Sequence, residues 1–213
     1  MNTEVLKELT QAWGVSGREK AVRAIIAREL QGHVDGMEVD AMGNLIAVKR
    51  GRGGGKRIML SAHMDEVGAQ VKRIEPDGRI LIHKVGWVWA AAMYNDKVVF
   101  QNGAVGVVGC SCPVEEAKND IAKLYVDIGC ISKEETERFV KVGDYCGFIG
   151  AYHELKNDCI AAKSLDDRVG CYLLIEAAKR NDGNRENDVY YVFTVQEEVG
   201  CRGAQVAAER IHP

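Results

Sequence analysis

The chain has 213 residues, enough to bury one large hydrophobic core or two smaller ones. Its 28 Lys and Arg residues against 31 Asp and Glu give a net charge of −3 without long runs of either sign, so we expect no nucleic-acid and no membrane partner. The sequence has no apolar stretch of membrane-spanning length, its first residues show no basic start followed by an apolar run, and its seven cysteines are irregularly spaced. These features predict a cytoplasmic protein with reduced thiols.

The N-terminal part of the sequence predicts an α/β arrangement. Apolar residues at helical spacing predict two helices within the first thirty residues, with Ser16 as N-cap of the second, three residues ahead of Glu19. Residues 37–40 and 44–49 read as two short strands around a Met-Gly turn, and the apolar run that follows predicts a buried strand ending at Ser61.

The middle of the sequence predicts an all-β domain. Runs 71–74 and 79–82 flank Glu-Pro-Asp-Gly, which is a hairpin signal. Further short β-type runs and one helix follow, the runs at 98–100, 104–108, 123–128 and 145–149 and the helix at 132–140. Strands this short and this frequent indicate a small barrel or sandwich.

The α/β pattern then returns, with an amphipathic helix over 167–179, an apolar strand over 189–195 and a helix starting near Gly203. We therefore predict one α/β domain formed by residues 1–69 and 159–213. An inserted all-β, barrel-like domain of residues 70–158 interrupts it.

Three polar clusters stand out, at Ser61–Glu66, Ser164–Arg168 and Gln196–Glu198. Two of them directly follow apolar, strand-like runs. Side chains at the carboxyl ends of strands in an open α/β sheet converge on a ligand crevice. A histidine, an aspartate and a glutamate that meet there would suit zinc, cobalt or manganese.

Each cluster also has a purely structural explanation. Asp166 and Asp167 could cap and charge the start of the following helix, where carboxylates are favoured. Glu197 and Glu198 could form a solvated strand end, and a single histidine such as His63 is more often structural than a ligand. Taken singly, each cluster is explained more simply by structure, but their combination favours a shared site.

The segments SAHMDEVG, KSLDDRVG and QEEVGCRGA resemble the three signature segments of the tetrahedral-type dinuclear metalloaminopeptidases. This is the glutamyl and deblocking aminopeptidase family, some members of which were once labelled endoglucanases. Similar segments at 14–17, 42–45 and 126–144 extend the resemblance over essentially the whole chain. The resemblance implies a phosphorylase/hydrolase-like, three-layer α/β/α catalytic domain, incomplete here, interrupted by a β domain that contributes oligomer contacts and access control.

The resemblance also implies a role for each residue of the site. Two divalent metal ions, zinc or cobalt with manganese as a further candidate, share one carboxylate. His63 matches the histidine of the first metal, Asp166 the bridging carboxylate and Glu198 a ligand of the second metal. Glu197 matches the general base, and Asp65 a carboxylate that orients the imidazole.

The neighbouring residues Asp167 and Arg168 receive no ligand role, and we expect them to form a helix-start ion pair. The family pattern needs two further ligands, an aspartate beyond the Gln-Glu-Glu segment and a histidine near the end of a longer chain. His212 does not match that histidine. With two protein ligands for each metal instead of the usual three, we expect weak metal binding, a C-terminally truncated chain and little or no activity of this chain alone.

The predicted function is that of a metal-dependent aminopeptidase, a hydrolase that removes N-terminal residues from peptide substrates through a water bridging two metals. We expect a homo-oligomer. The alternative is a catalytically inactive assembly or regulatory subunit of a peptidase complex. A glycosidase using Glu197 and Glu198 fits poorly, because adjacent carboxylates on one strand rarely reach both sides of a sugar ring.

Overall fold

The computed structural model describes residues 3–117, 120–182 and 186–213, which form two compact units. The first unit consists of the described residues up to Glu66 and from Ala151 onward, and the second of Val67–Gly150. Each unit has a hydrophobic core of its own. No helix within the described ranges is both long and apolar enough to cross a membrane.

A four-stranded mixed sheet forms the centre of the first unit. Its order is β1-β2-β12-β3, with β1 (Gly36–Val39), β2 (Leu45–Lys49), β12 (Asp188–Thr194) and β3 (Arg57–His63). Strand β12 runs antiparallel to β2 and parallel to β3, so that Thr194 lies opposite His63 at the carboxyl end of both strands. This register brings two segments that are far apart in the sequence to one edge of the sheet.

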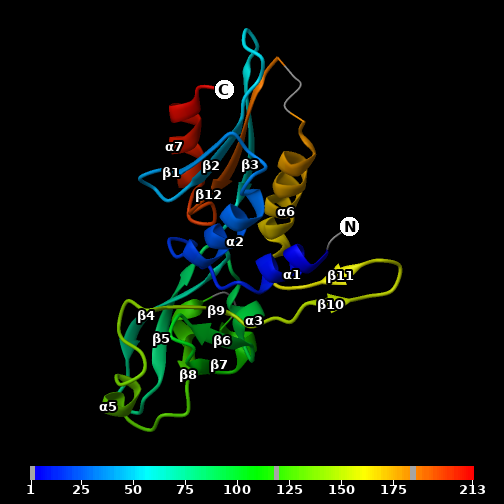
Figure 1. Cartoon of the computed structure of the whole chain (residues 1–213). Coiled ribbons are helices and arrows are strands. Elements are labelled where there is room, and N and C mark those ends of the chain that lie inside the picture. The colour runs from blue at the N-terminus through cyan, green and yellow to red at the C-terminus, as the bar shows by residue number, and fades with distance from the viewer. Residues whose placement is uncertain (1–2, 118–119, 183–185) are drawn as a thin grey trace. The chain divides into compact units, whose positions relative to one another are not determined.

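Helices cover both faces of this sheet (Figure 1). Helices α1 (Thr3–Gln11), α2 (Lys20–Leu30) and α6 (Leu165–Arg180) pack on one face, and α7 (Arg202–Ile211) packs on the other. The period of two along β12 places Phe193 in the core beneath α2 and α6, and Val192 in the smaller core beneath α7.

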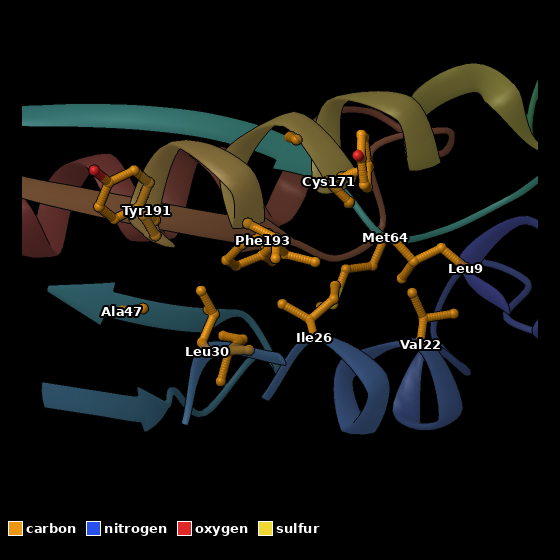
Figure 2. Close-up of a cluster of buried hydrophobic side chains, with 14 of the residues drawn as sticks. Leu9, Val22, Ile26, Leu30, Ala47, Met64, Cys171, Tyr191 and Phe193 are labelled. Atoms are coloured by element: carbon orange, nitrogen blue, oxygen red, sulfur yellow. The ribbon is translucent and has the colours of Figure 1, made fainter. Parts of the chain in front are cut away.

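The larger core explains why α2 forms where it does. Val22, Ile26 and Leu30 recur every four residues, which places them on one face of the helix, and all three are fully buried. Figure 2 shows Ile26 pointing toward Met64, with Phe193 of β12 in the same cluster. Burying one such side chain stabilises the fold by about 1.5–3 kcal/mol. Met64 directly follows β3, so the core also anchors the segment that leaves this strand.

The second unit contains a closed barrel of six strands. Its order is β4-β5-β8-β7-β6-β9, and neighbouring strands pair antiparallel. The strands are β4 (Gly68–Ile74), β5 (Ile80–Val85), β6 (Lys97–Phe100), β7 (Val105–Cys110), β8 (Leu124–Asp127) and β9 (Tyr145–Phe148). The connections contain the short helices α3 (Ala90–Met93), α4 (Val114–Ala117) and α5 (Lys133–Thr136) and the 3-10 turn η1 (Ile121–Lys123). Outside the barrel, β10 (His153–Glu154) and β11 (Ile160–Ala161) form a small hairpin in the first unit.

The mixed α/β fold with a barrel agrees with the sequence prediction, but two predicted boundaries are wrong. The strand expected to end at Ser61 continues to His63, because its parallel pairing with β12 extends that far. The helix expected over 132–140 ends at Thr136 and continues only as turns. These turns still bring Val140 into the barrel core, because Thr136 and Val140 are both fully buried and the Val140 amide donates to the Thr136 carbonyl (2.9 Å).

The start of α5 offers a test of local stability. The Ser132 hydroxyl accepts a hydrogen bond from the amide of Glu135 (3.3 Å), and the Glu135 carboxylate accepts one from the amide of Ile131 (3.0 Å). Replacing Ser132 with alanine removes the first bond, and we expect the free energy of unfolding in urea to fall by about 1 kcal/mol. Ser132→Asp keeps an acceptor and should remain close to wild type. Equal stabilities of the two variants would contradict this role.

Candidate functional site

The predicted clusters lie at the carboxyl ends of two neighbouring parallel strands. Strand β3 ends at His63 and β12 ends at Thr194, and the amide of Met64 donates to the carbonyl of Thr194 (2.8 Å). The segments that leave these strands, 64–66 and 195–198, therefore emerge at the same edge of the sheet. This edge is where ligand sites form in α/β folds.

Three potential metal donors meet at this edge. Among the described residues, His63, Glu197 and Glu198 form a group whose ligand atoms all lie within 4.8 Å of one another. Asp166, at the start of α6, approaches the group through His63, with Nε2 and Oδ1 3.0 Å apart. Its side chain is 87% exposed, whereas that of His63 is 9% exposed. The structure thus brings together the residues predicted for the site, with Glu197 placed among the possible donors.

The imidazole of His63 is held in one orientation. Its Nδ1 lies 3.1 Å from the backbone carbonyl oxygen of Asp65 and 3.5 Å from the Asp65 carboxylate. Because a carbonyl only accepts, Nδ1 carries the proton in the neutral ring, which leaves Nε2 to face Asp166 and Glu197. Burial alone would lower the pKa of His63, but Asp65, Asp166 and Glu197 raise it to about 9.

Asp65 connects the two segments of the site. Its carboxylate is fully buried and accepts hydrogen bonds from the Ser16 hydroxyl (2.5 Å), the Glu197 amide (3.0 Å) and the Glu198 amide (3.1 Å). Burial alone would raise the pKa of Asp65, but these donors and His63 lower it. Asp65 therefore remains ionised and fixes the backbone that carries both glutamates.

The electrostatics of the cluster favour a cation. Burial raises the pKa of Glu198, and the negative charges of Asp65, Glu197 and Asp166 raise it further against the opposing effect of His63. Carboxylate oxygens and an imidazole nitrogen are donors that zinc, cobalt and manganese accept. A bound divalent cation would offset the repulsion among these carboxylates, so the donor set fits the predicted metal.

A thiol also contacts the cluster. Cys201 lies just before α7, and its Sγ is 3.1 Å from Oε1 of Glu197, to which it donates. The hydrogen bond to Glu197, together with the negative charge of that carboxylate, raises the pKa of this thiol. The thiol therefore stays protonated and serves as a hydrogen-bond donor to the carboxylate.

The helix-start ion pair predicted for Asp167 and Arg168 is wrong. The Asp167 carboxylate accepts hydrogen bonds from the amides of His63 (3.3 Å) and Gly170 (3.1 Å). Arg168 is fully buried, lies 3.7 Å from Glu66 and donates to the carbonyl of Ala12 (3.1 Å). Because the Arg168 guanidinium is fully buried, it needs a charge partner that is buried with it, and Glu66 provides that partner.

Sequence reasoning missed three further residues near the site. Ser16, predicted to be an N-cap, instead binds Asp65, and the N-cap of α2 is Glu19, which makes no side-chain capping bond. The Glu19 carboxylate accepts from the amide of Gln196 (3.1 Å). Glu66 is buried and bonds to Lys163 and Ser164. The signal available for Ser16 and Glu19 was their capping-box spacing, which points to a local role.

A mixed α/β fold whose strand ends bring an imidazole and two carboxylates together defines a candidate metal site of the kind used by metal-dependent hydrolases. The chain belongs to the M42 glutamyl aminopeptidase family, whose model matches residues 43–213. The resemblance found in the three motifs is thereby confirmed.

Individual relatives agree with this assignment. The chain is 43% identical over 211 residues to a putative aminopeptidase of Acetivibrio thermocellus, covering 99% of this chain and 63% of the relative. A TET aminopeptidase structure from a marine-sediment Thaumarchaeota archaeon superimposes with a TM-score of 0.92 at 32% identity, covering 99% and 63%. The Pyrococcus horikoshii TET1 peptidase gives a TM-score of 0.86 at 38% identity, covering 99% and 66%. The chain spans less than two thirds of the length of each.

Proposed function

We propose that this site is that of a metal-dependent aminopeptidase, a hydrolase that removes N-terminal residues from peptides. The observation that carries the proposal is the convergence of His63, Glu197 and Glu198 within 4.8 Å at two strand ends. Membership of the M42 glutamyl aminopeptidase family supports the same reaction. The activity of the whole protein and its peptide substrates are part of this proposal.

The donors divide between two divalent ions, for which zinc, cobalt and manganese are the candidates. His63 would bind the first ion, Glu198 the second, and Asp166 would bridge them. Such ions, when bound, supply a water of lowered pKa and polarise the scissile carbonyl. Asp65 keeps the imidazole of His63 in the orientation that leaves Nε2 available, because the carbonyl of Asp65 accepts from Nδ1 (3.1 Å).

Glu197 would act as the general base. Its side chain is 37% exposed, so water and a peptide reach the carboxylate. It would accept a proton from the attacking water as the water oxygen bonds to the scissile carbon, and return that proton to the leaving amine as the C–N bond breaks. The thiol of Cys201, 3.1 Å from Oε1, would orient this carboxylate.

The number of ligands limits what this chain does alone. His63 and Asp166 give the first ion two protein ligands, and Asp166 and Glu198 give the second ion two, whereas catalytic zinc usually keeps three. We therefore expect weak metal binding and little turnover from the 213-residue chain.

The two parts of the chain would divide the work. Residues 1–69 and 159–213 would form the metallopeptidase domain, with a phosphorylase/hydrolase-like, three-layer α/β/α fold, and residues 70–158 would serve oligomerisation and access control. A cytoplasmic homo-oligomer is the proposed state. The related TET1 peptidase assembles into a tetrahedron or a large octahedral shell. A catalytically inactive assembly or regulatory subunit is the alternative function, which the shortage of metal ligands would favour.

Metal binding by a His63→Ala variant tests the site. Removing the buried imidazole should weaken Co²⁺ binding, measured by titration, by at least about 10-fold, and should abolish hydrolysis of aminoacyl-p-nitroanilides. The exposed His153 provides the matched control, and His153→Ala should bind as wild type does. Equal binding by all three proteins would refute the site. A wild-type chain that assembles into oligomers without binding metal or hydrolysing peptides would favour the subunit function.

A further inference from the structure

We propose that the loop Gly14–Glu19 is a positioning element of the candidate site. Its Ser16 hydroxyl would fix the carboxylate of Asp65, and its Glu19 carboxylate would fix the backbone at Gln196. The proposal rests on the proposed function, because it concerns how the same donors are held. The hydrogen bonds of these two side chains go to Asp65, Gly17 and Gln196 and not to the side chains of His63, Glu197 or Glu198, so both are positioning residues and not catalytic residues.

Backbone contacts attach this loop to the segment that follows His63. Val15 and Glu66 form a parallel bridge. The Glu66 amide donates to the Gly14 carbonyl (3.0 Å), and the Ser16 amide donates to the Glu66 carbonyl (3.3 Å). The Gly14 amide in turn donates to the Glu66 carboxylate (2.9 Å). These three hydrogen bonds, made by Gly14 and Ser16, place Ser16 beside Asp65 with little freedom.

Ser16 acts on the orientation of the Asp65 carboxylate. Its side chain is buried, and its hydroxyl donates to Oδ2 of Asp65 (2.5 Å). The same Oδ2 accepts from the Glu198 amide, while Oδ1 accepts from the Glu197 amide. Because the hydroxyl fixes the rotation of the carboxylate, both oxygens stay aligned with the two amides.

Glu19 binds the same turn at Gln196, the residue before Glu197. Its carboxylate is 4% exposed and accepts from the amides of Gly17 (2.6 Å) and Gln196 (3.1 Å) through the same oxygen. Gln196 has φ +56, a left-handed conformation that is unfavourable for a residue with a side chain. A hydrogen bond to its amide therefore stabilises a conformation that the sequence alone does not favour.

Together the two carboxylates hold three consecutive amides. Glu19 binds the amide of Gln196, and Asp65 binds those of Glu197 and Glu198. Burying a charged carboxylate costs more free energy than burying a neutral backbone carbonyl, which could accept the same hydrogen bonds from these amides. The side chains presented by this turn are the proposed base and a proposed ligand, and the holding of its backbone sets where they lie.

Co²⁺ affinity and amide hydrogen exchange of the full chain test the proposal. Ser16→Ala and Glu19→Ala should each weaken Co²⁺ binding about 10-fold, as loss of residues behind a ligand typically does. Both should accelerate exchange at residues 196–198 of the metal-free protein, with β12 and α7 unchanged. Glu19→Gln keeps an oxygen acceptor and should restore both properties. Lys20→Ala, at an exposed neighbouring position, is the matched control.

The exchange measurement does not depend on metal, so the two proposals fail separately. A wild-type chain that binds no Co²⁺ contradicts the proposed function, while local exchange at residues 196–198 still decides whether the loop holds this turn. Unchanged exchange in Ser16→Ala and Glu19→Ala overturns the positioning role. So does uniformly faster exchange throughout the first unit, which would assign both residues to general stability.

Discussion

A Glu66→Ala variant is expected to lose about 3–5 kcal/mol of unfolding free energy, the range for breaking a buried ion pair by removing one partner. The Glu66 carboxylate is 3% exposed and bonds to Lys163, Ser164 and the amide of Gly14. It is also 3.7 Å from the guanidinium of Arg168. Removing it leaves a fully buried arginine without its carboxylate partner. Urea unfolding monitored by circular dichroism measures the loss.

Three further variants, Glu154→Ala, Arg168→Met and the double variant Glu66→Ala/Arg168→Met, isolate the buried charge. Glu154→Ala removes a carboxylate from an exposed position of the same unit and should change stability by less than about 0.5 kcal/mol. Combining Glu66→Ala with Arg168→Met removes both charges, so the double variant should be more stable than the sum of the two single losses predicts. Simple additivity would show that Glu66 and Arg168 are not coupled.

The second large effect is expected from Glu197→Gln. An amide does not accept the proton of the attacking water, so the low turnover of aminoacyl-p-nitroanilides expected with added Co²⁺ should be lost, because removing a general base slows such a reaction by about 10²–10⁴-fold. The variant keeps the size of the side chain and the amide held by Asp65 (3.0 Å). Co²⁺ affinity should therefore stay near that of the wild type. Turnover and a parallel Co²⁺ titration give the two measurements.

Glu198→Gln is the informative comparison, because the carboxylate of Glu198 is proposed to bind metal and not to accept a proton. It should weaken Co²⁺ binding strongly, whereas Glu209→Gln, at an exposed position of α7, should alter neither property. Glu197 lies within the same 4.8 Å group as Glu198. If Glu197→Gln loses Co²⁺ as completely as Glu198→Gln, then Glu197 is a ligand and the base must be sought elsewhere.

Much of the fold follows from local pattern. The four-residue spacing of Val22, Ile26 and Leu30 predicted a helix, and the Glu-Pro-Asp-Gly turn predicted the hairpin of β4 and β5. The order of strands in the barrel did not follow, because β9 pairs with β4 and β6 across long stretches of chain. Periodicity identifies which residues face a core, but it does not identify the neighbouring strand.

For the site, too, local pattern predicted some features and missed others. Polar residues after apolar runs identified His63, Glu197 and Glu198, since strand ends at one sheet edge converge. Ser16 and Glu19 were assigned to a helix cap because their spacing is that of a capping box. Their actual partners are 49 and 177 residues away in the sequence. Local spacing carries no information about such distant hydrogen bonds. The roles of His63, Asp166 and Glu198 as ligands, and those of Glu197 and Asp65, stay predictions.

The parallel pairing of β3 with β12 has a consequence for folding kinetics. His63 and Thr194 are register partners separated by more than a hundred residues, and the second unit lies between them in the chain. Loop-closure entropy grows only with the logarithm of loop length, so this insertion adds little to the equilibrium cost. Pairings of such high sequence separation slow folding, however. The edge of the sheet that carries the donors should therefore be completed late, after the local hairpins and helices have formed.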